Sequence, residues 1–316
     1  MGWTKFAVGE GVAKTVSSLS GKLIGTTGGS LAMSALAGTV IGAIQCLSGF
    51  MGFLAGQRVG TKLTALFPDL RSVRWAIMFG LMASIFGTVW SIYTFTLGAD
   101  IGIRTLLIMG SIIPGAILDR IFWREKMTAP QILGILVFLV AAWAMLDFPS
   151  LGTIASLPIW VPAVLVITFT QSINEALSRA ASVKLDHWVN NFWVGGTTVL
   201  SCLSVILLLA VFSDKLTLNP TPIFVAGAML TGIIVVPMIA FKLLSYKGGG
   251  TIAMKKIIMQ GTYLITAVLA GIVVYHEPLT MGKGVGTGLF FVSVALTQGG
   301  KIWGAKHEPS GALSAK

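Results

Sequence analysis

Nine stretches of this sequence come close to the length and apolarity that a helix needs to cross a lipid bilayer. Such a helix takes roughly 20 largely apolar residues. Of the 316 residues, 55% are hydrophobic and only 10% are charged, which excludes an ordinary soluble domain. We therefore expect an all-α polytopic membrane protein. The expected spans cover residues 31–54, 74–97, 101–122, 132–146, 157–178, 189–212, 222–244, 251–275 and 280–296.

The first 23 residues form a tenth candidate helix of a different kind. Lys5, Glu10, Lys14 and Lys22 make this stretch too polar to face lipid on all sides. A helix of this composition either lines an aqueous cavity or lies on the membrane surface. Counting it, the chain is expected to have about ten transmembrane helices.

The basic residues predict the orientation of these helices. Loops rich in Lys and Arg stay on the cytoplasmic side of a membrane. If ten helices start from the cytoplasm, only Lys22, Lys215 and Lys283 fall outside. We expect an integral protein of the plasma (inner) membrane with both termini cytoplasmic. The net charge of +11 is then balanced by lipid head groups and needs no nucleic acid. The expected inside positions are Arg58, Lys62, Arg71, Arg74, Arg120, Arg124, Lys126, Arg179, Lys184, Lys242, Lys247, Lys301, Lys306 and Lys316.

Two parts of the chain read as copies of each other. Residues 103–111 align with 254–262, and residues 124–128 align with 276–280 after a shift of one position. This duplication predicts two five-helix repeats, residues 1–148 and 149–300, followed by a cytoplasmic tail, 301–316. Because five is odd, the repeats would be inverted in the membrane, the 5+5 arrangement that permits alternating access in secondary transporters.

The repeated motif resembles a known family. A Glu-x-x-Thr pair closes a long apolar helix and a glycine opens the next one, at Glu125 to Thr128 with Gly134 and at Glu277 to Thr280 with Gly286. This pattern is similar to the EamA-like repeat of the drug/metabolite transporter superfamily, over residues 31–296. The resemblance implies a 5+5 carrier whose cavity is lined mainly by helices one, three, four, six, eight and nine. The polar first helix departs from the family.

Arg104 and the Lys255-Lys256 pair fall at equivalent places in the two copies. Cations inside transmembrane helices are energetically costly, so they usually face a cavity and meet an anion there. Two alternatives are that they extend to the head groups, since they lie about one turn from their helix starts, or that they form structural ion pairs. Similar cations occur in the triose-phosphate translocator branch of the superfamily, where a Lys-Arg pair on the ninth helix holds the substrate phosphate.

The sixth expected helix carries a polar stripe. Gln171, Asn174, Glu175 and Ser178 are three or four residues apart, so they share one face that must point inward. Glu175 could hydrogen-bond a substrate, carry a coupling proton or pair with a cavity lysine. Three further polar side chains could contact a ligand or equally satisfy a neighbouring backbone group: Asn191, Gln260 and Tyr263.

The last expected helix is rich in glycine. Gly282, Gly284, Gly286 and Gly288 form two small-xxx-small pairs, which predict close helix packing, including that of a homodimer. The chain has no nucleophile elbow, Walker loop or paired catalytic carboxylates. We expect no enzyme activity, no cofactor and no metal.

These observations predict a secondary transporter for a small anionic organic metabolite, phosphorylated or carboxylated. Arg104, Lys255 and Lys256 would bind the anionic group, and Glu175 would be their partner or a proton site. One alternative is an exporter of neutral or zwitterionic metabolites, amino acids or drugs by proton exchange. The other is a non-transporting structural subunit of a membrane complex, which the polar first helix keeps open.

Overall fold

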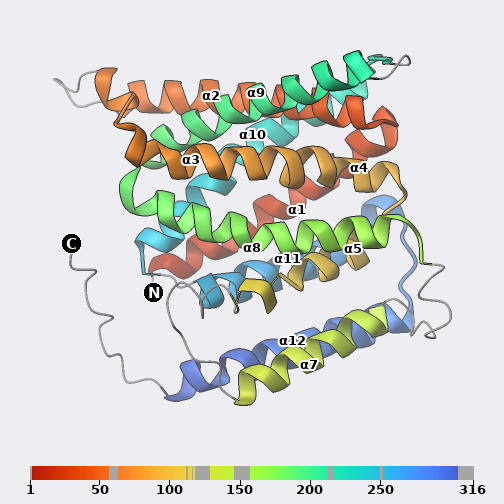
Figure 1. Ribbon diagram of the computed structural model, residues 1–316. Helices are drawn as coiled ribbons and strands as arrows, with labels where there is room; N and C mark the ends of the chain where they lie inside the picture. The colour runs from red at the N-terminus through yellow and green to blue at the C-terminus, as the bar shows by residue number, and fades with distance from the viewer. Residues whose placement is uncertain are drawn as a thin grey trace.

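The regular secondary structure in the described part of the chain is entirely helical (Figure 1). The computed structural model describes residues 2–56, 63–111, 113–115, 117, 129–145, 157–212, 216–249 and 252–304. The expected all-α class is confirmed, and each of the ten expected stretches contains a described helix. The helices are α1 (Gly2–Gly28), α2 (Leu31–Ala55), α3 (Leu70–Met82), α4 (Ser91–Thr96), α5 (Ile101–Met109), α7 (Ala129–Met145), α8 (Trp160–Lys184), α9 (His187–Phe212), α10 (Pro222–Lys247), α11 (Ile252–Tyr275) and α12 (Met281–Gly304).

Several of these helices begin and end where local chemistry requires it. Ser30, Asp100 and Thr221 cap the first turns of α2, α5 and α10, each accepting a hydrogen bond from a backbone N–H three residues later. Gly29, between α1 and α2, and Gly98, before α5, have φ of 68° and 90°, which favours glycine. A π-helical stretch, Ala83–Trp90, joins α3 and α4 into one rod.

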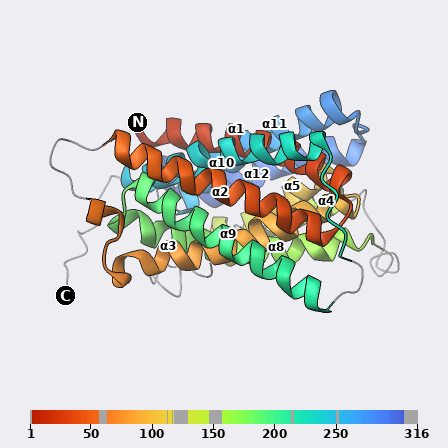
Figure 2. The same ribbon diagram turned by 90° about the horizontal axis from the view of Figure 1, so that it is seen from above.

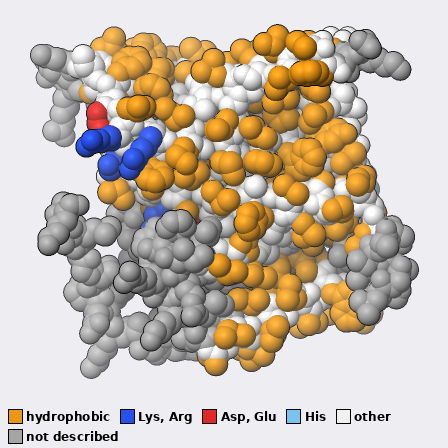
Figure 3. All heavy atoms as spheres, viewed as in Figure 1, with side chains coloured by type: hydrophobic (Ala, Val, Ile, Leu, Met, Phe, Trp, Pro, Cys, Tyr) orange, Lys and Arg blue, Asp and Glu red, His pale blue; other side chains and the backbone are white. Residues whose placement is uncertain are grey.

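Five described helical stretches are long and apolar enough to cross a membrane, judged by length and composition. They are α2, the α3–α4 rod, α9, α10 and Ile258–Tyr275 of α11. Hydrophobic side chains cover most of the described face in Figure 3, whereas the blue basic side chains gather at one edge, where α3 begins. On α9, Leu207 is 66% and Phe212 82% exposed. Such an apolar surface is that of a membrane protein.

Helix α1 packs along one side of the bundle, beside α10 and α11 (Figures 1 and 2). Its glycines allow this close approach. A Cβ atom on Gly11 would lie 2.6 Å from the Met259 carbonyl oxygen of α11, and one on Gly25 would lie 2.7 Å from the Ile92 carbonyl oxygen of α4. Of the two sequence-based interpretations of α1, the structure agrees with a cavity-lining helix and contradicts a surface helix.

Helices α7 and α12 pack against each other at one edge of the bundle (Figure 1). The rings of Phe138 and Phe290 meet edge to face, with centroids 6.2 Å apart. Ser293 Oγ donates a hydrogen bond of 2.6 Å to the Gly134 carbonyl oxygen. A Cβ atom on Gly286 would lie 2.8 Å from the carbonyl oxygen of Ala141, so the two backbones are in close contact. The predicted close packing of the glycine-rich helix is therefore found within the chain, and a homodimer stays a prediction.

Helix α2 packs along α9 in an antiparallel manner. Cβ atoms built on Gly38 and Gly42 of α2 would meet Cys202 and Thr198 of α9, so residue numbers rise on one helix as they fall on the other. The same relation holds between α7 and α12. These pairs hold the two sequence halves together across long stretches of helix.

Candidate anion-binding cavity

A cavity of about 140 Å³ lies in the middle of the bundle. The lining comes from α1, α2, the α3–α4 rod, α5, α8, α9, α10 and α11, while the described part of α7 and α12 contributes none of it. The family resemblance implied a lining by helices one, three, four, six, eight and nine, which are α1, the α3–α4 rod, α5, α8, α10 and α11. All six line the cavity, and α2 and α9 do so as well.

The π-helical stretch of the α3–α4 rod opens onto this cavity. Ala83, Gly87 and Thr88 belong to the stretch and line the wall. π-Helical turns occur frequently at functional sites, because the wider turn re-aims side chains and backbone groups. Apolar side chains such as Ile108 and Ile167 form other parts of the wall.

Arg104 points into the bundle and not toward a membrane surface. Its side chain is 3% exposed, and its guanidinium lies 4.4 Å from the centroid of the Phe95 ring. Arg104 Nε donates to Thr94 Oγ1 at 3.0 Å, and Nη2 donates to Ser91 Oγ. No described carboxylate forms an ion pair with it. The head-group alternative is therefore wrong for Arg104, whose charge is buried beside neutral hydroxyls.

Lys14 of α1 is a second cation on the cavity wall, and the sequence analysis did not single it out. Its Nζ lies 5.2 Å from the centroid of the Tyr263 ring, and no described carboxylate is within ion-pair distance of it. Tyr263 OH hydrogen-bonds Ser18 Oγ, one turn further along α1, at 2.5 Å, and its hydroxyl also interacts with Arg104. Tyr263 therefore stands between the two cations.

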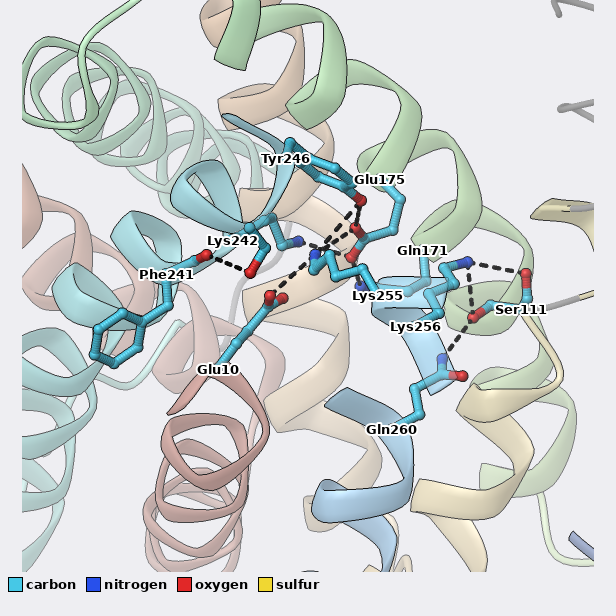
Figure 4. Close-up of polar contacts among 11 residues, drawn as sticks. Glu10, Ser111, Gln171, Glu175, Phe241, Lys242, Tyr246, Lys255, Lys256 and Gln260 are labelled. Atoms are coloured by element: carbon cyan, nitrogen blue, oxygen red, sulfur yellow. Dashed lines mark hydrogen bonds and ion pairs between the residues drawn. The ribbon is translucent and has the colours of Figure 1, made fainter. Parts of the chain in front are cut away.

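A buried ion network adjoins the cavity at the N-terminal end of α11 (Figure 4). Lys255 Nζ is 3.0 Å from Glu10 Oε2 and 2.9 Å from Glu175 Oε2. Lys242 Nζ is 2.9 Å from Glu175 Oε1, and Tyr246 OH donates to Glu175 Oε2. Lys255 and Glu175 are each 0% exposed. Of the three roles left open for Glu175, the structure shows the pairing with lysines, and Lys255 forms the structural ion pair that the sequence left open.

Lys256 lies on a different side of α11 from Lys255 (Figure 4). Its Nζ donates to the Ser111 carbonyl oxygen at 3.0 Å and lies 3.4 Å from Ser111 Oγ, which also accepts from Gln260 Nε2 at 3.3 Å. Lys256 is 2% exposed, so the head-group alternative is wrong here as it is for Lys255. Neither lysine is on the described cavity wall.

Some of the other predicted site residues line the cavity and others do not. Gln171 lines the cavity and donates to Glu175 Oε1 at 3.3 Å. Asn191 is off the wall, where its amide bonds Gln45 at 3.0 Å and the His187 carbonyl oxygen at 3.0 Å. Of the eight predicted site residues, the cavity wall holds three and the rest lie behind or beside it. On the wall are Arg104, Gln171 and Tyr263; off it are Glu175, Lys255, Lys256, Gln260 and Asn191.

The sequence carried a signal for the residues that were missed. Glu10, Lys14, Ser18 and Gly21 are three or four residues apart on α1, so they form one polar face, and all four line the cavity. The polar stripe of α8 also contributes Asn174 to the cavity wall. Its Oδ1 is buried without a hydrogen-bond partner among the described residues. The number of charged residues in α1 was considered in the sequence, but their helical spacing, which defines this face, was not.

The cavity wall and the adjoining network carry an excess of positive charge. Their described members include four cations and two carboxylates, with the cations being Lys14, Arg104, Lys242 and Lys255 and the carboxylates Glu10 and Glu175. Buried charge without a counter-charge is costly. A site with this balance attracts anions. In the described part of the chain, no group of three or more His, Cys, Asp or Glu side chains could hold a metal ion.

A second ion cluster closes the other end of α11. Lys22 Nζ is 2.5 Å from Glu277 Oε1, and Lys283 Nζ is 2.7 Å from Asp100 Oδ2 and 3.9 Å from Glu277 Oε2. Burial raises the pKa of Asp100, but hydrogen bonds from Lys283 and from the Ile103 N–H outweigh it and hold that pKa below its ordinary value. Glu10 and Lys22 are about 18 Å apart along α1 at 1.5 Å per residue. The cavity-lining residues of α1 lie between the two clusters.

Comparisons with known proteins find the same fold in a solved structure but identify no function. No protein-family model and no curated protein matches the chain. One solved structure, described only as a crystal structure of a protein, superposes with a TM-score of 0.63 at 16% sequence identity. The match covers 93% of this chain and 95% of the other. At this identity the likeness shows that nearly the whole helical bundle is a fold also found elsewhere.

Proposed function

We propose that this protein is a secondary transporter that moves a small organic anion, carboxylated or phosphorylated, across a membrane by alternating access. One observation carries the proposal. Arg104 and Lys14 face the central cavity, and no described carboxylate pairs with either. A guanidinium and an ammonium are the groups that proteins use to hold carboxylate and phosphate. A bound anion would supply the missing counter-charge.

The contact between α7 and α12 supports an inverted duplication. Gly134 and Gly286, equivalent in the sequence alignment, are 152 positions apart. The same offset relates Phe138 to Phe290, and these two rings touch each other. Equivalent residues contact each other only when they lie on the axis that relates the two halves. The antiparallel course of the two helices fits a two-fold axis in the membrane plane.

The neighbouring contacts agree with that axis. Gly134 contacts Ser293. The residue equivalent to Gly134 in the second half is Gly286, and the residue equivalent to Ser293 in the first half is Ala141, each at an offset of 152 positions. Gly286 and Ala141 also contact each other. The packing of whole helices follows the same correspondence, in which α1 is equivalent to α8, α3 to α10 and α5 to α11. Helix α1 packs on α10 and α11, and α8 packs on α3 and α5. This pattern supports a 5+5 inverted repeat in which α1 to α7 correspond to α8 to α12. It also supports the resemblance to the drug/metabolite transporter superfamily, although residues 125–128 of the first motif lie outside the described part of the chain.

The distribution of exposed cations supports the expected orientation. Arg71, Arg74, Lys184 and Lys247 are exposed at the end of the bundle where α3 begins and where α8 and α10 end. At the other end, Lys22 and Lys283 are held in ion pairs. We infer that the first end is cytoplasmic in a plasma (inner) membrane, with both termini on that side. Arg58, Lys62, Arg120, Arg124, Lys126 and the tail after residue 304 lie outside the described residues.

The two ion clusters suggest how access to the cavity would alternate. Each cluster ties α1 to α11 or to the residues that follow α11, one at each end of the cavity. Opening the Lys22–Glu277 cluster would admit substrate from one side, and opening the Glu10–Lys255 cluster would release it to the other. Two halves of similar architecture can exchange such conformations at nearly equal free energy.

Uptake into reconstituted vesicles tests the proposal. The assay uses radiolabelled carboxylates and phosphate monoesters on purified wild type, Arg104→Gln and Lys14→Gln. Each variant removes a charge-assisted contact of about 1.5–3 kcal/mol, so we expect uptake efficiency to fall roughly 10- to 100-fold. Arg74→Gln is the matched control, because this exposed arginine lies far from the cavity wall. Uptake of no anion by wild type, or unchanged uptake by both cavity variants, contradicts the proposal.

A zwitterionic substrate is the second candidate, and one observation favours it. Glu10 lines the same cavity as Arg104, so a substrate ammonium could meet the carboxylate while its carboxylate meets the guanidinium. Thermal stabilisation by amino acids, with none by dicarboxylates or phosphate monoesters, would select this candidate. The structural-subunit alternative loses much of its motivation, because Glu10, Ser18 and Lys22 of α1 have partners within the bundle and Lys14 faces the cavity.

A further inference from the structure

Asn174 of α8 presents a hydrogen-bond acceptor without a partner to the central cavity. Its side chain lines the cavity wall and is 3% exposed. Its Oδ1 is buried and accepts no hydrogen bond from the described residues. Glu10 Oε2, the other such acceptor on the described wall, lies 3.0 Å from Lys255 Nζ in an ion pair. Asn174 Oδ1 is therefore the buried polar side-chain atom of the described wall that has no partner of either kind.

Hydroxyl groups on the same wall are already engaged by their own helices. Thr88 Oγ1 donates to the Ala83 carbonyl oxygen at 3.2 Å, and Thr198 Oγ1 donates to the Val194 carbonyl oxygen at 2.8 Å. They have no hydroxyl proton left to offer Asn174. A buried acceptor that lacks a donor destabilises the folded protein, so such groups are rare and call for an explanation. A ligand that brings its own donor into the cavity would supply the missing hydrogen bond.

The amide of Asn174 lies close to Arg104 along the α3–α4 rod. A Cβ atom on Gly87 of the rod would lie 4.0 Å from Asn174 Nδ2, and Arg104 Nη2 donates to Ser91 Oγ, one turn further along the rod. Four residues advance a helix by at most about 6 Å, at 1.5 Å per residue. Two hydrogen bonds of about 2.9 Å each nearly cover that distance. One small molecule can therefore contact both side chains if its donor is close to its acid group.

The charge of the wall favours a neutral donor at Asn174. The described wall carries three cations and one carboxylate, and that carboxylate, Glu10, is already paired with Lys255. A substrate ammonium would add a further positive charge to this surface, whereas a hydroxyl group adds none. A hydroxyl also donates one hydrogen bond, which is what the orphaned Oδ1 lacks.

We propose that the transported anion is a short hydroxy acid and that Asn174 selects for its hydroxyl group. The acid group binds Arg104, and the hydroxyl, one or two carbon atoms away, donates to Asn174 Oδ1. An analogue without the hydroxyl leaves this oxygen buried and unpaired, which is how a binding site discriminates against such a molecule. The inference rests on the proposed transport function and narrows its substrate class.

Uptake of matched pairs of acids into reconstituted vesicles tests this selection. The pairs differ only in hydroxyl groups: lactate and propionate, malate and succinate, glycerol 3-phosphate and propyl phosphate. In each pair that wild type transports, we expect the uptake efficiency of the hydroxylated member to be about 10-fold higher, the effect of one hydrogen bond. Asn174→Leu keeps the branched shape of the side chain but removes the amide, so the preference should disappear.

Ser178→Ala is the matched control for the loss of an unpaired polar group. Ser178 lies one turn further along α8, and its Oγ is buried without a hydrogen-bond partner among the described residues, but it is not on the described cavity wall. We therefore expect this variant to keep the preference. Alanine, which carries an ammonium in place of the lactate hydroxyl, should be taken up less efficiently than lactate by wild type.

The other outcomes overturn the inference in distinguishable ways. Equal efficiencies within every transported pair would overturn it and leave the transport proposal standing. A preference that persists in Asn174→Leu would assign the hydroxyl to another residue, and alanine uptake above that of lactate would select the zwitterionic candidate. Uptake of no anion by wild type would overturn both proposals. The wild-type comparison needs no variant, and Asn174→Ala replaces Asn174→Leu if the latter does not fold.

Discussion

Neutralising Glu175 should destabilise the protein strongly, because this carboxylate holds two buried lysines. Its oxygens lie 2.9 Å from Lys242 Nζ and 2.9 Å from Lys255 Nζ, and its side chain is 0% exposed. In Glu175→Gln, Lys255 keeps Glu10, but Lys242 keeps no carboxylate among the described residues within ion-pair distance. Removing one partner of a buried pair costs about 3–5 kcal/mol. We expect the free energy of unfolding to fall by that amount.

A double-mutant cycle separates this loss from simple packing effects. Lys242→Met removes the cation that Glu175→Gln leaves alone, so the double variant should lose about 2 kcal/mol less than the sum of the two single losses. The assay is unfolding by SDS in mixed micelles, followed by tryptophan fluorescence. Lys247→Met is the control, because this lysine lies on the same helix as Lys242 but is exposed at its end. A loss below about 1 kcal/mol for Glu175→Gln, with additive single effects, would refute the buried network.

Three further predictions test other parts of the account. Gly286→Ala should destabilise the protein by about 1–3 kcal/mol through overpacking, whereas Gly288→Ala, which has open space around it, should be neutral or stabilising by up to about 1 kcal/mol in the same titration. The His187 hydrogen bond lowers the pKa of Asp186 to about 2 from its ordinary 3.8, so its stabilising effect should be complete above about pH 4 and lost as the pH falls through about 2, as carboxyl NMR titration can check. Glu277→Gln should weaken the cluster of Lys22, Glu277 and Lys283 and speed thiol labelling of a cysteine placed on the cavity wall; an unchanged rate would contradict a closing role for that cluster.

The sequence predicts the helices well because their length and apolarity are local properties. The rod formed by α3 and α4 begins at Leu70, four residues earlier than expected, because Arg71 and Arg74 stay exposed at its polar end. Gly134 and Gly286, which marked the duplicated motif in the sequence, both lie in the α7–α12 contact, but the sequence did not predict that these two helices pack together. Which helices become neighbours depends on contacts between distant residues, which a single sequence does not encode locally.

The site was harder to predict than the fold. Lys255 and Lys256 were treated as a unit, but neighbours on an α-helix point about 100° apart, so they reach different surroundings. Helical geometry alone could have shown that both cannot bind one anion in the same way. Lys14 was overlooked because its importance depends on facing Tyr263 and on having no carboxylate partner in the described structure, and only the tertiary fold reveals both.

The most direct test of the central claim is to locate a bound anion in the cavity. Selenate carries two negative charges and an anomalous scatterer, so crystals of the wild-type protein soaked in it report the position of an anion without knowledge of the substrate. The account predicts an anomalous peak in contact with both Arg104 and Lys14, absent in Arg104→Gln. Peaks confined to exposed cations such as Arg71, with none in the cavity, would contradict it.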